Sequence, residues 1–158
     1  MAIDALVKPM LPLAIFTGLK PLQITEIARR AERIIYRPGE TIIEEDTVGD
    51  AAVLIVAGDA VRISGPEYRG TPEPVSPGSL LGEMAMLVES VHSSTIIARG
   101  NVKALRITRA EMLEQMEEDP SLAEHFVERI TGRLRSLAED LRNADHAFAR
   151  WSAGASLH

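Results

Sequence analysis

The sequence predicts a mainly β protein: a jelly-roll β-roll with N-terminal helices and one long C-terminal helix. Between residues 33 and 108, short segments rich in β-branched and aliphatic residues alternate with Gly- or Pro-containing turns. Their spacing of roughly 8–12 residues is typical of a sandwich or barrel of short strands. Helical patterns occupy residues 21–32 and the region after residue 108.

Composition sets limits on the class of protein. The chain has 158 residues, no cysteine, 46% hydrophobic residues and a formal net charge of −6. A chain of this length forms one domain with its own core, and the lack of cysteine excludes disulfides and thiolate zinc sites. The negative charge argues against a general nucleic-acid surface. Because the chain shows neither a long apolar run nor a secretory signal pattern, we expect no membrane contact and a cytoplasmic location.

The N-terminal helix is expected over residues 21–32, because its apolar residues share one face and Pro21 stands in its first turn. Pro9 and Pro12 disfavour helix at the residues before them. Glycine and proline punctuation then marks the strands and turns. Strands are expected at 33–36, 40–43, 51–57, 60–64 and 102–107, with a polar turn at 44–50, a hairpin turn at Gly58-Asp59 and an exposed hairpin tip at 65–74.

Two helices are expected after the last strand. Thr108 and Glu111 form a capping-box pattern for a helix over residues 109–117, and a final helix follows Pro120 to about residue 150. Its apolar residues recur at a 3,4 spacing that predicts contact between two copies of the chain. They are Val127, Ile130, Leu134, Leu137, Leu141, Ala144, Phe148 and Trp151. The alternative is that the first half packs on the β-roll. We assign residues 1–119 and 120–158 to one domain, the second part being the long helix and tail.

Residues 80–98, LLGEMAMLVESVHSSTIIA, carry the strongest functional pattern. Gly82 allows a sharp turn, and residues 83–87 favour one short helical turn whose first N–H groups point outward. Such N–H groups attract an anion, most readily a phosphate. The hydroxyls at 93–95 add donors, and Glu83 can accept from a sugar hydroxyl. These residues predict a pocket for a phosphorylated sugar; the alternative is a tight turn between two strands.

This segment resembles the phosphate-binding cassette of the cyclic nucleotide-binding domain family, which includes the bacterial catabolite activators and protein kinase A regulatory subunits. LGEMAM matches the first half of the cassette, and SSTIIA matches the second half. The resemblance extends over about residues 11–145, through YRPGETII, Gly49-Asp50, Gly58 and Pro77-Gly78. Asp46 replaces a family glycine in one turn, where Asp tolerates the left-handed conformation.

The resemblance implies a cyclic nucleotide ligand, cyclic AMP or cyclic GMP, and no cofactor or metal. The backbone at 82–85 and the residue at 92 would hold the cyclic phosphate, Glu83 the ribose 2′-hydroxyl, and Ser93 the phosphate or a guanine edge. Leu137 and Ala138 replace a Thr-Ser pair of the activators, so we expect an apolar lid over the base. The implied site comprises Leu81, Gly82, Glu83, Met84, Ala85, His92, Ser93, Ser94 and Leu137.

His92 departs from the family, which has arginine at this position. A guanidinium gives a fixed charge and two parallel donors, whereas imidazole is charged only when protonated. Losing a charge-assisted contact costs roughly 1.5–3 kcal/mol, about 10- to 150-fold in affinity. We therefore expect weaker binding than in members that keep the arginine, and tighter binding as pH falls from about 8 to 6 if His92 meets the phosphate.

Two functions remain open. The first is a cyclic nucleotide-binding regulatory module whose last helix responds to ligand and signals to an effector protein. The second is a degenerate member that serves as a dimerising or docking module without nucleotide. An enzyme is not expected, because the histidines at 92, 125, 146 and 158 lack a close His-x-His spacing. A haem sensor with His92 as iron ligand is a further alternative. No helix-turn-helix pattern follows residue 150, so DNA binding is not expected either.

Overall fold

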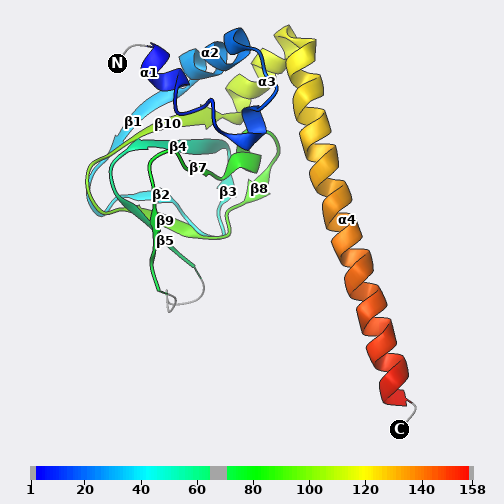
Figure 1. Ribbon diagram of the computed structural model, residues 1–158. Coiled ribbons are helices and arrows are strands. Elements are labelled where there is room, and N and C mark those ends of the chain that lie inside the picture. Colours follow the sequence, from blue (N-terminus) through cyan, green and yellow to red (C-terminus); the bar gives the residue numbers. More distant parts are fainter. Residues whose placement is uncertain (1–2, 65–70, 157–158) are drawn as a thin grey trace.

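The computed structural model describes residues 3–64 and 71–156, and it confirms the predicted fold class (Figure 1). Two antiparallel four-stranded sheets form the roll, and helices cover one side of it. The helices are α1 (Ile3–Val7), the 3-10 turn η1 (Ala14–Phe16), α2 (Pro21–Arg30), the 3-10 turn η3 (Glu83–Met86), α3 (Arg109–Glu118) and α4 (Pro120–Ser156). The strands are β1 (Glu32–Tyr36), β2 (Thr41–Ile43), β3 (Val48–Gly49), β4 (Ala51–Ala57), β5 (Ala60–Ile63), β6 (Glu73–Val75), β7 (Leu80–Leu81), β8 (Ser90–Val91), β9 (Thr95–Ala98) and β10 (Val102–Thr108).

The strand order explains the apolar character of β4. One sheet has the order β1-β10-β4-β7 and the other β2-β9-β5-β6, while β3 and β8 form a separate ribbon. Side chains alternate between the faces of a strand. Val53 and Ile55 of β4 therefore face the inside of the roll, and Ala52 and Leu54 belong to the cluster beneath the helices. Both faces are buried, so the strand reads as a continuous apolar run.

Three turns differ from the sequence-based predictions. The hairpin predicted at Gly58-Asp59 is wrong, because β4 and β5 belong to different sheets and this turn carries the chain between them. Gly58 has φ +105°, and a Cβ there would collide with the Asn101 carbonyl. The predicted polar turn at 44–50 contains β3, which pairs with β8. Of the predicted tip at 65–74, residues 65–70 lie outside the described residues, and β6 pairs with β5.

The helical ends shift by a few residues. The chain ahead of Pro9 forms α1. Helix α2 ends at Arg30, where Ala31 takes up extended backbone and leads into β1. Helix α4 continues to Ser156. The predicted N-cap of α3 is confirmed, since the Glu111 N–H donates to Thr108 Oγ1 at 3.2 Å. The Glu111 carboxylate does not complete a capping box; it lies 3.8 Å from Arg30 Nη1.

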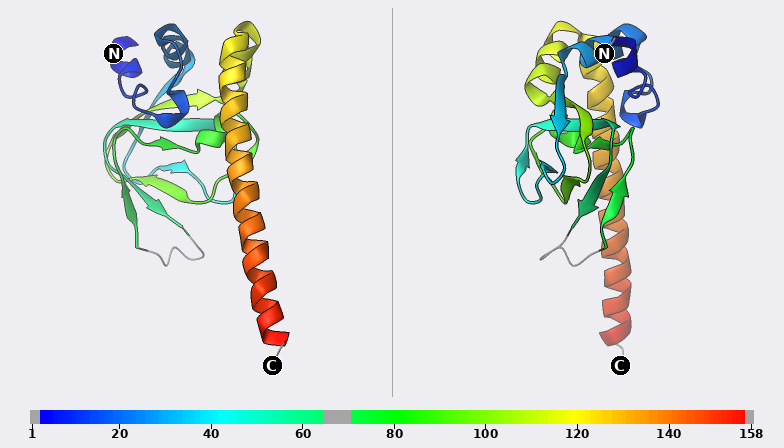
Figure 2. Two further views of the ribbon diagram at one scale, coloured as in Figure 1. Left: turned by 45° about the vertical axis from the view of Figure 1, so that its right-hand side comes forward. Right: turned by 90° about the vertical axis from the view of Figure 1, so that its left-hand side faces the viewer.

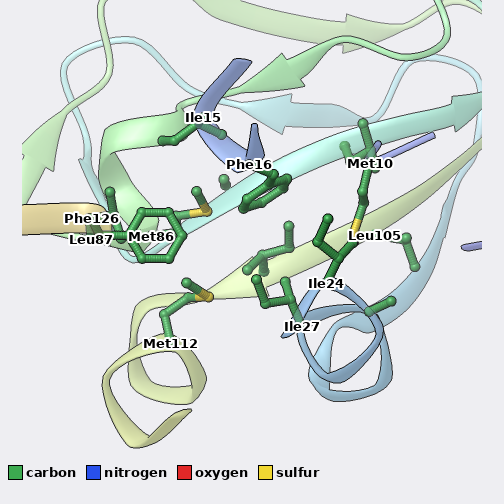
Figure 3. Close-up of a cluster of buried hydrophobic side chains, with 14 of the residues drawn as sticks. Met10, Ile15, Phe16, Ile24, Ile27, Met86, Leu87, Leu105, Met112 and Phe126 are labelled. Atoms are coloured by element: carbon green, nitrogen blue, oxygen red, sulfur yellow. The ribbon is translucent and has the colours of Figure 1, made fainter. Parts of the chain in front are cut away.

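A core beneath the helices joins η3 to α4 (Figure 3). Met86 of η3 is fully buried in the same cluster as Phe16 of η1 and Phe126 of α4. The rings of Phe16 and Phe126 meet edge to face with their centroids 6.3 Å apart. The predicted cassette helix and the long helix therefore share buried side chains.

Helix α4 starts on the domain and then leaves it (Figures 1 and 2). Asp119 caps it by accepting from Ser121 N at 3.1 Å, and Asp119 also accepts from Gln23 of α2 at 2.9 Å. Hydrogen bonds from Gln23 and Ser121 hold the pKa of Asp119 below its usual value. Leu122 and Phe126 are buried, whereas residues 132–149 are exposed. The predicted packing on the domain is thus present for the beginning of the helix but does not extend over its first half. Among the described residues, no helix has the length and apolar character needed to cross a membrane.

Candidate functional site

A cavity of about 560 Å³ opens at the mouth of the roll, within the size range of small-molecule sites. Its floor is the inner face of β2, β5 and β9, its rim is the stretch from β7 to β9, and α4 contributes one side chain. The lining residues are Ile43, Arg62, Ser64, Leu80, Leu81, Gly82, Glu83, Met84, Ser90, Val91, His92, Ser93, Ser94, Ile96 and Arg133.

The cavity brings together seven of the nine residues that the sequence analysis assigns to the site. These are Leu81, Gly82, Glu83, Met84, His92, Ser93 and Ser94. Ala85, within η3, is fully buried and does not line the cavity. Leu137 also lies outside the lining and is 52% exposed, one helical turn beyond Arg133. The apolar lid over the base therefore stays a prediction.

The predicted sharp turn is present, and the two residues that follow it, Glu83 and Met84, line the cavity. Gly82 has φ 63° and ψ 40°, the left-handed conformation that glycine adopts without strain. η3 follows at once, and its first internal bond runs from Ala85 N to Gly82 O at 2.9 Å. Within the described part of the chain, the N–H groups of Glu83 and Met84 have no hydrogen-bond partner. Successive unpaired N–H groups of this kind can bind an anion.

His92 lies against two glycines on the wall of the cavity. A Cβ on Gly82 would lie 2.9 Å from His92 Cε1, and one on Gly49 would collide with the ring. The backbone is fixed as well, because His92 N donates to Thr47 O at 2.9 Å and Asp46 N donates to His92 O at 2.9 Å. Asp46 has φ 63°, as predicted for the residue that replaces the family glycine. The ring position is therefore set by packing on Gly49 and Gly82.

Glu83 is already engaged by a residue that the sequence analysis did not assign to the site. Arg133 Nη1 of α4 lies 2.9 Å from Glu83 Oε1. Arg133 belongs to a row at i, i+4 and i+8 on one face of α4. His125 Nε2 is 2.8 Å from Ile15 O, and Arg129 Nη2 donates to Thr17 O at 2.7 Å. The helical spacing of these three residues was the available signal, but the sequence does not tell which face of the helix meets the domain.

Arg62 of β5 and Ser64, which directly follows β5, were also missed, and both line the cavity. The local signal in the sequence was the alternation of side chains along a strand. It places residues 62 and 64 on the same face as Ala60, which is buried inside the roll. No group of three His, Asp or Glu side chains that could hold a metal occurs among the residues that the structure describes.

Comparison with known proteins gives the family. Residues 33–119 match the cyclic nucleotide-binding domain. The cAMP-dependent protein kinase regulatory subunit of Aspergillus fumigatus is 32% identical over 95 residues, which are 60% of this chain and 23% of that protein. The cyclic AMP receptor protein of Thermus thermophilus is 27% identical over 141 residues, 86% of this chain and 65% of that protein. The chain thus spans about a quarter of the kinase subunit.

Solved structures agree. A cyclic nucleotide-binding-like protein from Brucella abortus has a TM-score of 0.67 at 26% identity, covering 72% of this chain and 99% of that one. The N-terminal domain of a transcriptional regulator from Streptomyces coelicolor has a TM-score of 0.73 at 21% identity, over 86% of this chain and 93% of that one, which shows the shared fold. The match to the family model covers residues 33–119, which is more than half of this chain. This chain therefore belongs to the cyclic nucleotide-binding domain family.

Proposed function

We propose that this chain is a regulatory module that binds cyclic AMP or cyclic GMP and transmits occupancy through α4. The observation that carries the proposal is the cavity, which gathers the unpaired N–H groups of η3, the Glu83 carboxylate and the 92–94 segment on one rim. The names of similar proteins support it: a cAMP-dependent protein kinase regulatory subunit, a cyclic AMP receptor protein and the human cyclic nucleotide-gated channel beta-1.

The proposed pose follows from the chemistry of the lining. The cyclic phosphate binds the N–H groups of Glu83 and Met84, with His92 and Ser93 beside it. The ribose 2′-hydroxyl donates to Glu83, because a carboxylate is an acceptor only. The base lies toward the apolar side chains of Ile43 and Ile96 on the floor of the cavity.

Glu83 provides the link to α4. Its ion pair with Arg133 competes with a ribose hydroxyl for the same carboxylate. The two side chains are 40% and 55% exposed, so the ion pair contributes only about 0–1 kcal/mol and a ligand can replace it. Nucleotide binding then changes the contact that ties the middle of α4 to the domain. A ligand shifts such an equilibrium only by its different affinity for the two helix positions.

The outer half of α4 is the proposed surface through which the module contacts other proteins. Its exposed apolar residues, Leu134, Leu137, Leu141 and Phe148, would pair in a homodimer and leave the helix flank for an effector protein. We place this regulation in the cytoplasm, with neither DNA nor membrane as partner.

A calorimetric titration with cyclic AMP and cyclic GMP tests the proposal. We expect saturable binding of at least one ligand below about 1 mM, weaker than in members with the cassette arginine because a charge-assisted contact is missing. Glu83→Gln should weaken binding, whereas Glu89→Gln, an exposed change on the same loop outside the lining, should not. No heat with either nucleotide at millimolar concentration would contradict the proposal and leave the docking module.

A further inference from the structure

We propose that Arg62 supplies the fixed positive charge for the nucleotide's phosphate, from the sheet floor instead of the cassette. Ser64 and Ser94 lie beside it. This inference rests on the proposed function of the cavity, and it assigns a ligand contact to β5.

The register of the second sheet places Arg62 on the inner face of the roll. Arg62 pairs with Ile96, and Ala60 pairs with Ala98. Ile96 and Ala60 are 1% and 3% exposed in the core inside the roll. Because alternate residues of a strand share a face, Arg62 lies on the inner face too, at the point where the buried core gives way to the open cavity.

The same register brings Arg62 close to the second half of the cassette. The ladder ends with the pair Ile63 and Thr95, and Ser64 and Ser94, the next residues beyond that end, both line the cavity. Arg62 lies one pair before the end of this ladder, so its long side chain is near the point where Ser64 and Ser94 follow. A guanidinium and two hydroxyls thus converge on the rim that also carries His92 and Ser93.

The distribution of charges in the cavity leaves the Arg62 guanidinium available to bind a phosphate. Among the residues that the structure describes, three side chains with a fixed charge line it, namely Arg62, Glu83 and Arg133, and the last two are paired with each other at 2.9 Å. Arg62 makes no ion pair with any residue in the described ranges 3–64 and 71–156. A cyclic nucleotide carries one negative charge, and a guanidinium can meet its phosphate with two parallel N–H donors. A cation from another strand therefore replaces part of the charge that a cassette arginine would supply.

Replacing Arg62 tests the assignment. Arg62→Gln should weaken the binding of cyclic AMP and cyclic GMP by the same factor, about 10- to 150-fold, as expected for a lost charge-assisted contact to the group that both share. Arg62→Lys keeps the charge without the fork and should weaken binding less. Arg99→Gln is the matched control, since Arg99 is an exposed arginine outside the cavity lining. Thermal unfolding of all three variants should match the wild type, because neither arginine is buried.

The outcomes separate this inference from the proposed function. A wild-type protein that binds neither nucleotide defeats both. If the wild type binds and Arg62→Gln binds equally well, the Arg62 assignment alone is wrong. A loss for one nucleotide that greatly exceeds the loss for the other would also overturn it, because it would place Arg62 at the base instead of the phosphate. As a second readout, the affinity of Arg62→Gln should depend less on salt than that of the wild type.

Discussion

His92 shows how one residue can fit the fold and change the chemistry of the site. Its ring fills the space over Gly49 and Gly82, two glycines whose lack of a side chain leaves room for it. The imidazole is thereby held on the rim of the cavity, within the cassette. Position 92 thus contributes an imidazole to the rim, not a guanidinium.

Gly49→Ala tests this packing. The new methyl group would collide with the His92 ring and lie 2.9 Å from Ala85 Cβ. Overpacking of this kind costs about 1–3 kcal/mol, so we expect urea unfolding to show a free energy of unfolding reduced by that amount. Gly100→Ala is the control, because a Cβ there meets nothing within 4 Å. In a His92→Ala background the cost of Gly49→Ala should fall. Equal effects at Gly49 and Gly100 would contradict this account of the ring.

At the scale of elements, α4 is fastened to the domain by two different kinds of contact. Leu122 and Phe126 are buried in the core that also contains Met86 of η3. Arg133, further along, contacts the exposed edge of the cassette through Glu83. The beginning of the helix is thus held by burial of apolar area, and its middle by a weak ion pair that a ligand can reach.

Arg133→Gln should release the middle of α4 without disturbing its beginning. Freed of its ion pair, Glu83 becomes available to the ribose, and nucleotide affinity should rise by about 1.4- to 5-fold, the equivalent of about 0.2–1 kcal/mol. Amide hydrogen exchange in α4 around residue 133 should become faster in the absence of nucleotide. Arg135→Gln, an exposed change elsewhere on the same helix, is the control. An affinity for Arg133→Gln equal to or below that of the wild type would argue against this coupling.

At the scale of the whole molecule, the projecting half of α4 exposes large apolar side chains to solvent in a single copy of the chain. Leu134, Leu141 and Phe148 are 61%, 69% and 66% exposed, and they follow the same 3,4 spacing as Leu137 (Figures 1 and 2). Burying one such side chain against a second copy stabilises by about 1.5–3 kcal/mol. Asp140 and Asp145 on the flanks of the seam oppose a parallel pair by repulsion.

Leu137→Glu combined with Leu141→Glu should therefore convert a dimer into a monomer. Sedimentation equilibrium of the wild type and of the double variant measures this change of oligomeric state. Arg142→Glu, a charge change next to the seam, is the control for the effect of added negative charge alone. Because the cavity lies on the domain, the double variant should still bind nucleotide. A wild type that remains monomeric at high concentration would exclude the homodimer.

The sequence alone determined the features that depend on neighbours along the chain. The strand predicted at 51–57 is β4 to the residue, the N-cap at Thr108 is present, and Asp46 and Gly82 adopt left-handed backbone. These are set by alternation, by side-chain capping and by local sterics, all of which act over a few residues. The cassette pattern is of the same kind, so most of the candidate site could be named in advance.

Only the tertiary structure decided which distant segments meet. The turn at Gly58-Asp59 looks like a hairpin, but β4 finds its partners in β10 and β7, and β5 finds its partners in β9 and β6. That choice turns Arg62 into the cavity, and the packing of Phe126 fixes the face of α4 that brings Arg133 to Glu83. Such placements depend on burying the inner faces of both sheets and the helix-covered face of one sheet at once, a property of the assembled core that no short stretch of sequence contains.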